Sequence, residues 1–259
     1  MKAPGDKDYV QSLERGLSVI LAFAARKPLL TLAQLTEATG LTRPTVRRLV
    51  LTLERLGYVR SEGRAYSLTP RVLALGHAFT SSLNLTESAQ GPMARAAEAV
   101  GHTCSLLVLD EEDAVFLHRV PARGGLPLLT SSRMPAFATA AGRVLLAGHR
   151  NMSLTGPFPK LTPWTVTDPV RLGQIVTDVR ERGWALVDQE YEEGVRSFSA
   201  PVRDSAGWVV AALGMSVPST VDMSVIKWEH VPALMSAADE ISAALGAEYH
   251  GFVLRRSAT

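Results

Sequence analysis

The stretch from Leu30 to Tyr66 constrains this chain most, because it predicts two short helices followed by two short strands. Thr42 is a suitable N-cap, Pro44 fits the first turn of a helix, and Gly57 ends the pattern. Between them, one apolar stripe recurs at helical spacing: Val46, Leu49, Val50, Leu53 and Leu56. Upstream, Thr31 can cap a shorter helix with Leu32, Leu35 and Ala38 facing inward, and Gly40 lies in the turn between the two helices. The stretch therefore predicts a helix-turn-helix.

Basic residues surround this predicted motif. No acidic residue stands between Glu37 and Glu54, and residues 58–60 and 65–68 read as two strands joined by a polar turn, which is a β-wing. A generic corner between two helices is the alternative for the helices alone. With the wing, the pattern favours double-stranded DNA as a partner, the helix start entering the major groove and the wing lying over phosphate. The predicted DNA-binding residues are Thr31, Thr42, Arg43, Thr45, Arg47, Arg48, Arg60 and Arg64.

Charge separates the two ends of the chain. Residues 1–83 hold 12 Lys/Arg against 6 Asp/Glu, whereas the remainder holds 15 against 19. This asymmetry predicts an anion-binding N-terminal domain, followed by an ordinary soluble domain with a small excess of acidic residues. The single cysteine, Cys104, excludes an internal disulfide framework and is expected to be buried and inert. The longest apolar run, Val209–Val217, is too short to span a membrane, and no signal core is present, so we expect a cytoplasmic protein without a membrane partner.

Helical patterns flank the predicted helix-turn-helix and wing. Residues 9–25 predict a first helix that packs under the recognition pair through Val10, Leu13, Leu17, Ile20, Leu21 and Ala24. After the wing, Thr69 and Pro70 start a linker helix with an apolar side formed by Val72, Leu75, Phe79 and Leu83. We expect this side to pair with a second copy of the chain, and packing on its own chain is the alternative. The predicted domains are 1–69 for DNA binding, 70–85 as the linker, 86–250 for effector binding and 251–259 as a basic tail.

The larger domain alternates helices with hairpins. Thr86 is expected to cap a helix through Val100, and strands are expected over 102–109, 114–120, 126–130, 184–187, 198–203 and 208–217. Further helices are expected over 138–147, over 169–182 between Asp168 and Gly183, and over most of 221–245. This order predicts an α+β fold around a largely antiparallel sheet.

Motifs of catalysis are missing from the sequence. No nucleophile elbow, phosphate loop, dinucleotide fingerprint or zinc-protease motif occurs, and the histidines lack metal spacing. The acidic cluster at 188–193 could be imagined as an acid/base group, but it reads as a solvated turn with at most one carboxylate facing a pocket. We expect no enzyme, cofactor or metal site, and an enzyme with an appended DNA-binding head is the alternative.

Several separated blocks of the chain resemble one family. Residues 9–17, the helix-turn-helix from 32 to 58, the block 135–147 and the segments 193–197 and 201–204 resemble the IclR family of bacterial transcriptional regulators, in the same order. The resemblance implies a winged helix-turn-helix, a dimerising linker helix and a GAF-like α/β effector-binding domain. It also implies a dimer or a dimer of dimers on a palindromic operator.

Within that family, the chain looks most like regulators of aromatic-acid catabolism, whose effectors are protocatechuate or 4-hydroxybenzoate. A regulator that senses an aliphatic keto acid or an amino acid is the alternative. The resemblance also carries over an effector pocket of apolar and hydroxyl-bearing positions, for each of which simple core packing is the alternative. The positions are Leu126, Met134, Ala140, Ala141, Val195, Ser197, Gly214 and Ser216.

Overall fold

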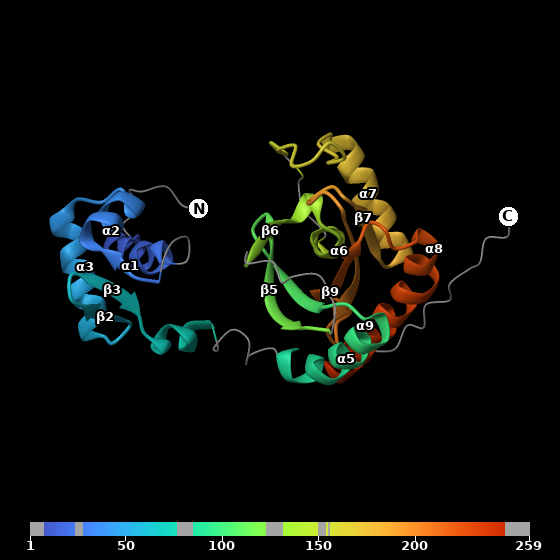
Figure 1. Ribbon diagram of the computed structural model, residues 1–259, viewed down its shortest axis with the longest axis horizontal. Helices are drawn as coiled ribbons and strands as arrows, with labels where there is room; N and C mark the ends of the chain where they lie inside the picture. The colour runs from blue at the N-terminus through green and yellow to red at the C-terminus, as the bar shows by residue number, and fades with distance from the viewer. Residues whose placement is uncertain are drawn as a thin grey trace. The chain divides into compact units, whose positions relative to one another are not determined.

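The protein is composed of two compact units, Met1–Ser82 and Leu83–Thr259, in a computed structural model that describes residues 8–23, 28–76, 85–122, 132–149, 154 and 156–246 (Figure 1). The expected α+β class is confirmed, since helices and antiparallel strands share each unit. Among the described residues, no helix has the length and hydropathy that crossing a bilayer requires.

The first unit is a small helical domain with a three-stranded sheet of order β1-β3-β2. Its elements are α1 (Gln11–Ala22), β1 (Leu30–Thr31), α2 (Leu32–Thr39), α3 (Arg43–Arg55), β2 (Val59–Glu62) and β3 (Ala65–Leu68). The predicted helix-turn-helix and wing are therefore present. Strand β1 was not predicted, and it pairs with β3 through Leu30 opposite Tyr66.

Local signals explain the bounds of α2 and α3. The Thr31 hydroxyl accepts a hydrogen bond from the Gln34 N–H at 3.3 Å, while the Gln34 side chain accepts one from the Thr31 N–H at 2.9 Å, which completes a capping box. Gly40 ends α2 with φ 65°, a conformation that glycine adopts without strain. Thr42 occupies the N-cap of α3 as predicted, but its hydroxyl contacts that of Thr45 at 2.9 Å instead of capping the backbone.

The orientation predicted for α1 is wrong. Its buried residue is Val19, followed by Ala22 and Phe23 at its end. Most of the predicted inward stripe lies on the surface: Val10, Leu13, Leu17 and Leu21 are 46–67% exposed. We call these four residues the α1 stripe. Ala38 and Leu56 are also exposed rather than inward-facing, while Leu35, Val46, Val50 and Leu53 form the core as expected.

The predicted linker helix begins as a short 3₁₀ turn, Pro70–Val72, after which residues 73–76 are helical. Val72 is half-buried, whereas Leu73 and Leu75 are 70% and 52% exposed. Phe79 and Leu83 lie outside the described residues, as do the basic tail and the strand predicted at 126–130.

The second unit is built on a six-stranded antiparallel sheet of order β6-β5-β4-β9-β8-β7. The strands are β4 (Cys104–Asp110), β5 (Asp113–Val120), β6 (Arg133–Pro135), β7 (Ala185–Asp188), β8 (Val195–Arg203) and β9 (Val209–Pro218). The helices are α5 (Leu85–Val100), η2 (Ala136–Ala138), α6 (Ala140–Gly148), α7 (Pro169–Arg182), α8 (Met223–Val225), η3 (Ile226–His230) and α9 (Val231–Ala244).

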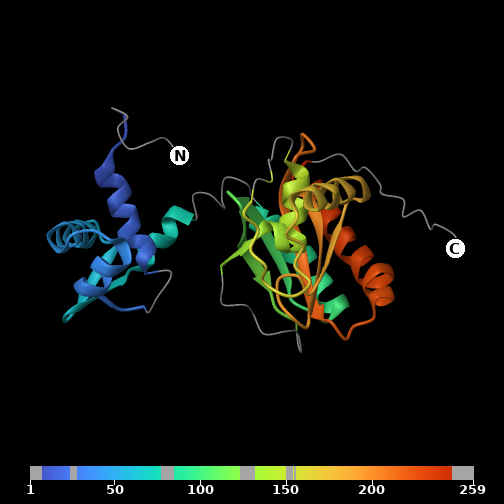
Figure 2. The same cartoon turned by 90° about the horizontal axis from the view of Figure 1, so that it is seen from above.

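The sheet carries a separate apolar core on each face. Leu106 and Val108 of β4 pack with α5 and α9, whereas Leu107 between them packs with α6, as the two-residue period of a strand requires. The sheet curls around α6, and α5 and α9 cover its other face (Figures 1 and 2). Cys104 belongs to the core on the α5 side, and burial raises the pKa of its thiol to about 12.

Helix α7 matches its prediction at both ends, because its signals are local. The Asp168 carboxylate accepts from the Arg171 N–H at 2.7 Å, Pro169 opens the helix, and Gly183 closes it with φ 79°. Two other helices differ from expectation. Thr86 lies inside α5 rather than capping it, and the closing helix contains a π-helical segment, Ile226–His230.

Candidate functional site: a basic helix and an effector-sized cavity

The start and outer side of α3 form a basic surface. Arg43, Arg47 and Arg48 are exposed, and Thr45 is half-buried. The apolar face of α3 holds the helix in place through Val46 and Val50, both fully buried. The arrangement leaves the arginine side chains on the surface, where they can reach phosphates or base edges.

The wing places its two predicted arginines differently. Arg64 is exposed in the turn between β2 and β3. Arg60 is tied within the wing, where its Nε lies 2.9 Å from Glu62 Oε1 and donates to Ser67 Oγ at 3.0 Å. Because Arg60 is paired within the wing, Arg64 is the wing residue whose charge is better placed for a partner. Thr31 is engaged in the capping box of α2. The DNA contacts of all these residues stay predictions.

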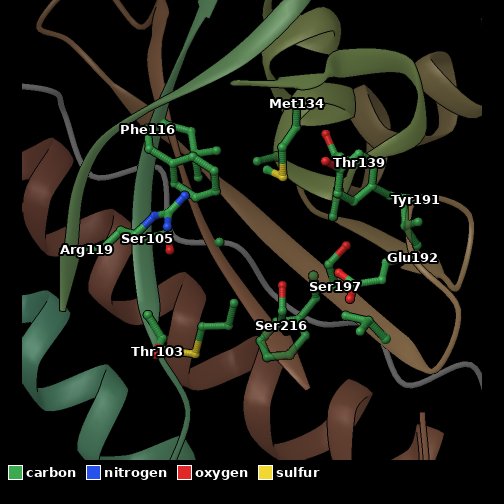
Figure 3. Close-up of a pocket in the computed structure, with 18 residues that line it drawn as sticks. Thr103, Ser105, Phe116, Arg119, Met134, Thr139, Tyr191, Glu192, Ser197 and Ser216 are labelled. Atoms are coloured by element: carbon green, nitrogen blue, oxygen red, sulfur yellow. The ribbon is translucent and has the colours of Figure 1, made fainter. Parts of the chain in front are cut away.

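A cavity of about 350 Å³ opens between the sheet and the start of α6 (Figure 3). Its walls come from β4, β5, β6, α6, β8, β9 and the segment after β7. Of the predicted effector residues, seven line it together: Met134, Ala140, Ala141, Val195, Ser197, Gly214 and Ser216. Leu126 lies outside the described residues. The size is in the range of small-molecule sites.

The start of α6 is a rigid wall of this cavity. Thr139 caps the helix by accepting from the Gly142 N–H at 3.2 Å. A Cβ atom on Gly142 would come within 2.2 Å of the Ala136 backbone, so only glycine lets η2 lie this close to the helix. Ala140 and Ala141 present small side chains to the cavity, which leaves room for a ligand.

A β-bulge supplies a cavity residue that the sequence pattern missed. On β4, Ser105 and Leu107 face the cavity, and they pair with Arg119 and Phe116 of β5. The pairing skips Leu117, so Phe116 and Arg119 share a face although regular alternation would separate them. The guanidinium carbon of Arg119 lies 3.3 Å from the centre of the Phe116 ring, and burial lowers the pKa of Arg119.

The opposite side of the cavity is formed by the segment between β7 and β8. Figure 3 shows Tyr191 and Glu192 there, across from Arg119 and Phe116. This separation follows from the strand order, in which β5 and β7 lie near opposite edges of the sheet. Burial raises the pKa of the Tyr191 phenol, with smaller contributions from Glu192 and Asp113. Thus one pole of the cavity is cationic and the other holds a phenol and a carboxylate.

A buried ion pair joins α6 to the segment after β7. Arg143 Nη1 and Nη2 donate to Glu190 Oε1 and Oε2, both at 2.7 Å, and Arg143 Nε donates to the Phe137 carbonyl at 2.9 Å. Glu190 Oε2 also accepts from the Val166 N–H at 2.9 Å. The prediction of a solvated acidic turn is therefore wrong for Glu190, which is 8% exposed. Its partner is distant in sequence, so no local pattern revealed it.

The turn that carries Glu190 is held in a defined shape. Gln189 has a φ of 60°, which is uncommon for a residue other than glycine. Its N–H donates to the Val195 carbonyl at 2.9 Å, and its side chain accepts from the Gly194 N–H at 3.0 Å. The position of Tyr191 and Glu192 is thereby tied to β8. Within the described ranges, no group of three or more His, Cys, Asp or Glu side chains is placed to hold a metal ion.

Comparison with known proteins assigns both units to one family. The IclR helix-turn-helix domain matches residues 12–63, and the C-terminal domain of the bacterial transcriptional regulator IclR matches residues 77–243. The chain is 38% identical over 246 residues to the Pca regulon regulatory protein of Pseudomonas putida, covering 92% of this chain and 84% of that protein. It is 30% identical over 254 residues to the transcriptional regulator KdgR of Escherichia coli, covering 95% of each.

Solved structures agree with this assignment. An IclR homolog from Microbacterium hydrocarbonoxydans, crystallised in complex with 4-hydroxybenzoate, superimposes with a TM-score of 0.81 at 25% identity, covering 90% of this chain and 98% of that one. The two family domains occur in the same order in this chain, over the basic helix and the cavity-bearing unit. The chain belongs to the IclR family of bacterial transcriptional regulators.

Proposed function

We propose that this protein is a ligand-responsive transcriptional regulator that binds a palindromic operator as a dimer or a dimer of dimers, and whose effector is an aromatic carboxylate such as 4-hydroxybenzoate or protocatechuate. In this proposal α3 reads the major groove and the wing contacts phosphate or the minor groove. The cavity of the second unit takes the effector, and the protein acts by binding rather than by catalysis.

The proposed dimer is supported by apolar surface on the first unit. The α1 stripe repeats at intervals of three and four residues, which is the spacing of a helix–helix seam. Leu73 and Leu75 add exposed apolar side chains at the start of the predicted linker. Side chains of this size gain about 1.5–3 kcal/mol each when they leave water, so a second copy that covers them would be held firmly. The predicted seam of Val72, Leu75, Phe79 and Leu83 remains part of the proposal.

One observation carries the proposed effector: the cavity combines an apolar middle with polar groups at separate ends. Leu107, Phe116 and Met134 can enclose a planar ring. A carboxylate has two possible anchors, namely Arg119 or the start of α6 with Ser197 and Ser216. The relative that was crystallised with 4-hydroxybenzoate has the same fold, which supports an aromatic acid as the effector.

A second candidate effector is an aliphatic hydroxy or keto acid. The cavity walls carry several hydroxyl groups, from Thr103, Ser105, Thr139, Ser197 and Ser216, which suit a ligand with more than one polar substituent. The likeness to KdgR, over 95% of both chains, shows that the resemblance is not limited to the Pca regulator. The aromatic acid is favoured because Phe116 and Met134 give the cavity large apolar walls.

Calorimetry on the full-length protein tests the proposal. The panel contains 4-hydroxybenzoate, protocatechuate, benzoate, an aliphatic keto acid and an amino acid, and fluorescence anisotropy measures the affinity for operator DNA from the region flanking the gene. We expect a hydroxybenzoate to bind and to change operator affinity, where a tenfold change corresponds to about 1.4 kcal/mol of coupling. Binding only of an aliphatic acid or an amino acid would remove the aromatic assignment.

Two variants locate the binding site within this experiment. Ala140→Leu should block the ligand sterically, because Ala140 is 1% exposed and faces the cavity at the rigid start of α6. Ser197→Ala should weaken binding by about 0.5–1.5 kcal/mol, the usual net value of one hydrogen bond. Ser205→Ala, on an exposed turn that does not line the cavity, is the matched control. Equal binding by all variants would place the ligand elsewhere.

A further inference from the structure

Arg119 reaches the cavity only because of the bulge in β5. In a regular strand, residues 116 and 119 point to opposite faces. The pairing of Leu107 with Phe116 and of Ser105 with Arg119 places both on the cavity face. Bulges recur where a strand must aim a side chain at a binding site. The local distortion of β5 thus has a definite result, which is a guanidinium in a mainly apolar cavity.

The stacking on Phe116 defines how Arg119 can bind. With its guanidinium carbon 3.3 Å from the ring centre, the planar group lies against the ring. A guanidinium that is stacked on one face still presents N–H donors along its edge, and these match the two oxygens of a carboxylate. The hydroxyl of Ser105, the cross-strand neighbour of Arg119, lines the same part of the cavity. This pole therefore brings a positive charge and a hydroxyl group to the cavity.

The other pole repels an acid group. Glu192 lines the cavity from the segment after β7, and Tyr191 stands beside it. A carboxylate here is an acceptor for a hydroxyl donor and is unfavourable for a second carboxylate. At the start of α6, Thr139 accepts from the Gly142 N–H, so this one backbone donor is already occupied.

We propose that Arg119 anchors the carboxylate of the effector and that Glu192 accepts a hydrogen bond from a hydroxyl at its other end. The inference rests on the proposed effector function, and it adds a specificity-determining residue at each pole. The ring lies between Phe116 and Met134, with the acid group toward β5 and the hydroxyl toward the segment after β7. The arrangement selects a ligand that has an acid and a hydroxyl at opposite ends, so benzoate, which lacks the hydroxyl, should bind less tightly.

The test compares 4-hydroxybenzoate with 4-hydroxybenzamide, which keeps the shape and removes the charge. Calorimetry is performed on the full-length wild type, Arg119→Met and Arg119→Lys. We expect the wild type to prefer the acid by about tenfold or more, and Arg119→Met to bind acid and amide with similar affinity. Arg119→Lys should fall between them, because a lysine keeps the charge but loses the paired donors. Thermal unfolding confirms that each variant is folded.

Two further variants complete the design. Glu192→Gln should reduce the preference for 4-hydroxybenzoate over benzoate and leave the preference for acid over amide intact. Arg95→Met is the matched control, because Arg95 is an exposed arginine of the same unit, paired with Glu240 and outside the cavity. It should behave as the wild type.

The outcomes separate the anchor from the effector proposal. If Arg119→Met keeps the wild-type preference for the acid, the carboxylate is held elsewhere and the inference is overturned. If the wild type binds an aliphatic acid instead of any hydroxybenzoate, the aromatic proposal fails. The same comparison of that acid with its own amide, in Arg119→Met, then supports or overturns Arg119 as the anchor.

Discussion

The arginines on α3 and the Arg143 side chain of the second unit have opposite surroundings. Arg43, Arg47 and Arg48 lie exposed on α3, whereas Arg143 is 2% exposed and bound to Glu190 and to the Phe137 carbonyl. Apolar side chains show the same two environments, since the α1 stripe lies on the surface of the first unit whereas Leu106 and Leu213 of the second unit are fully buried. The first unit thus leaves on its surface the groups that its proposed partners would cover. The second unit buries the Arg143–Glu190 pair and these leucines in its interior, and it contains the cavity.

The largest effect on stability is expected when the buried positive charge of Arg143 is removed. Arg143→Met leaves Glu190 buried without its partner, and we expect the second unit to lose about 3–5 kcal/mol of stability. Chemical denaturation monitors the loss. The matched substitution Arg47→Met should change stability by less than about 0.5 kcal/mol, as for other surface sites. The double variant Arg143→Met/Glu190→Leu should recover much of the loss, since apolar replacement of a buried pair is often neutral.

The second test addresses the exposed leucines. Leu13→Glu combined with Leu21→Glu places charges in the α1 stripe, and we expect dimers to dissociate, because each leucine contributes about 1.5–3 kcal/mol when buried. Light scattering measures the mass. Leu161→Glu is the control, since Leu161 is 40% exposed in the other unit. An unchanged mass in the double variant would show that the stripe is not the contact between chains.

The third test concerns operator binding. Arg47→Ala and Arg48→Ala should each weaken it, by about 1–3 kcal/mol where the side chain contacts a base edge. A phosphate contact instead weakens all sequences alike and lowers the salt slope by about 1. Anisotropy titrations on operator and random DNA at several salt concentrations distinguish the two. Full operator affinity in both variants would exclude α3 as the reading helix.

Near neutral pH no effect is expected at Cys104, and its contribution to stability changes only in alkali. Its pKa is raised from 9.0 to about 12 by burial, so the folded state keeps a proton that the unfolded state loses. This stability contribution is complete below pH 9 and is lost as pH rises toward 12, at up to about 1.4 kcal/mol per pH unit. Cys104→Ala should flatten the alkaline fall in stability. The thiol should not react with a disulfide reagent at pH 8 until the protein is denatured.

The sequence predicted elements well where their signals are local. The signals that bound helix α7 lie at its first residue, Pro169, and at the flanking residues Asp168 and Gly183. Helix α1 was predicted less well, because its orientation depends on contacts with other elements. Its periodicity revealed the α1 stripe correctly but could not say whether a stripe meets the core or the surface, and Val19, Ala22 and Phe23 form the buried side.

The cavity was predicted only in part, because the positions of Arg119 and Glu190 depend on contacts between segments that are distant in the sequence. The positions carried over from the family resemblance, such as Ser197 and Ser216, do line it. Arg119 was missed because the bulge at Leu117 reverses the alternation of β5, and no sequence pattern marks it. Glu190 was missed because its partner, Arg143, is on another element.

The close approach of Gly142 to Ala136 also limits how the protein can be redesigned as a biosensor. Any side chain at position 142 would collide with backbone, so libraries that alter ligand preference will lose folded members there. Gly214 is more permissive, since an added Cβ would make only ordinary contacts at 3.6 and 3.7 Å. Engineered specificity should therefore come from β5 and β9, with the α6 start kept constant.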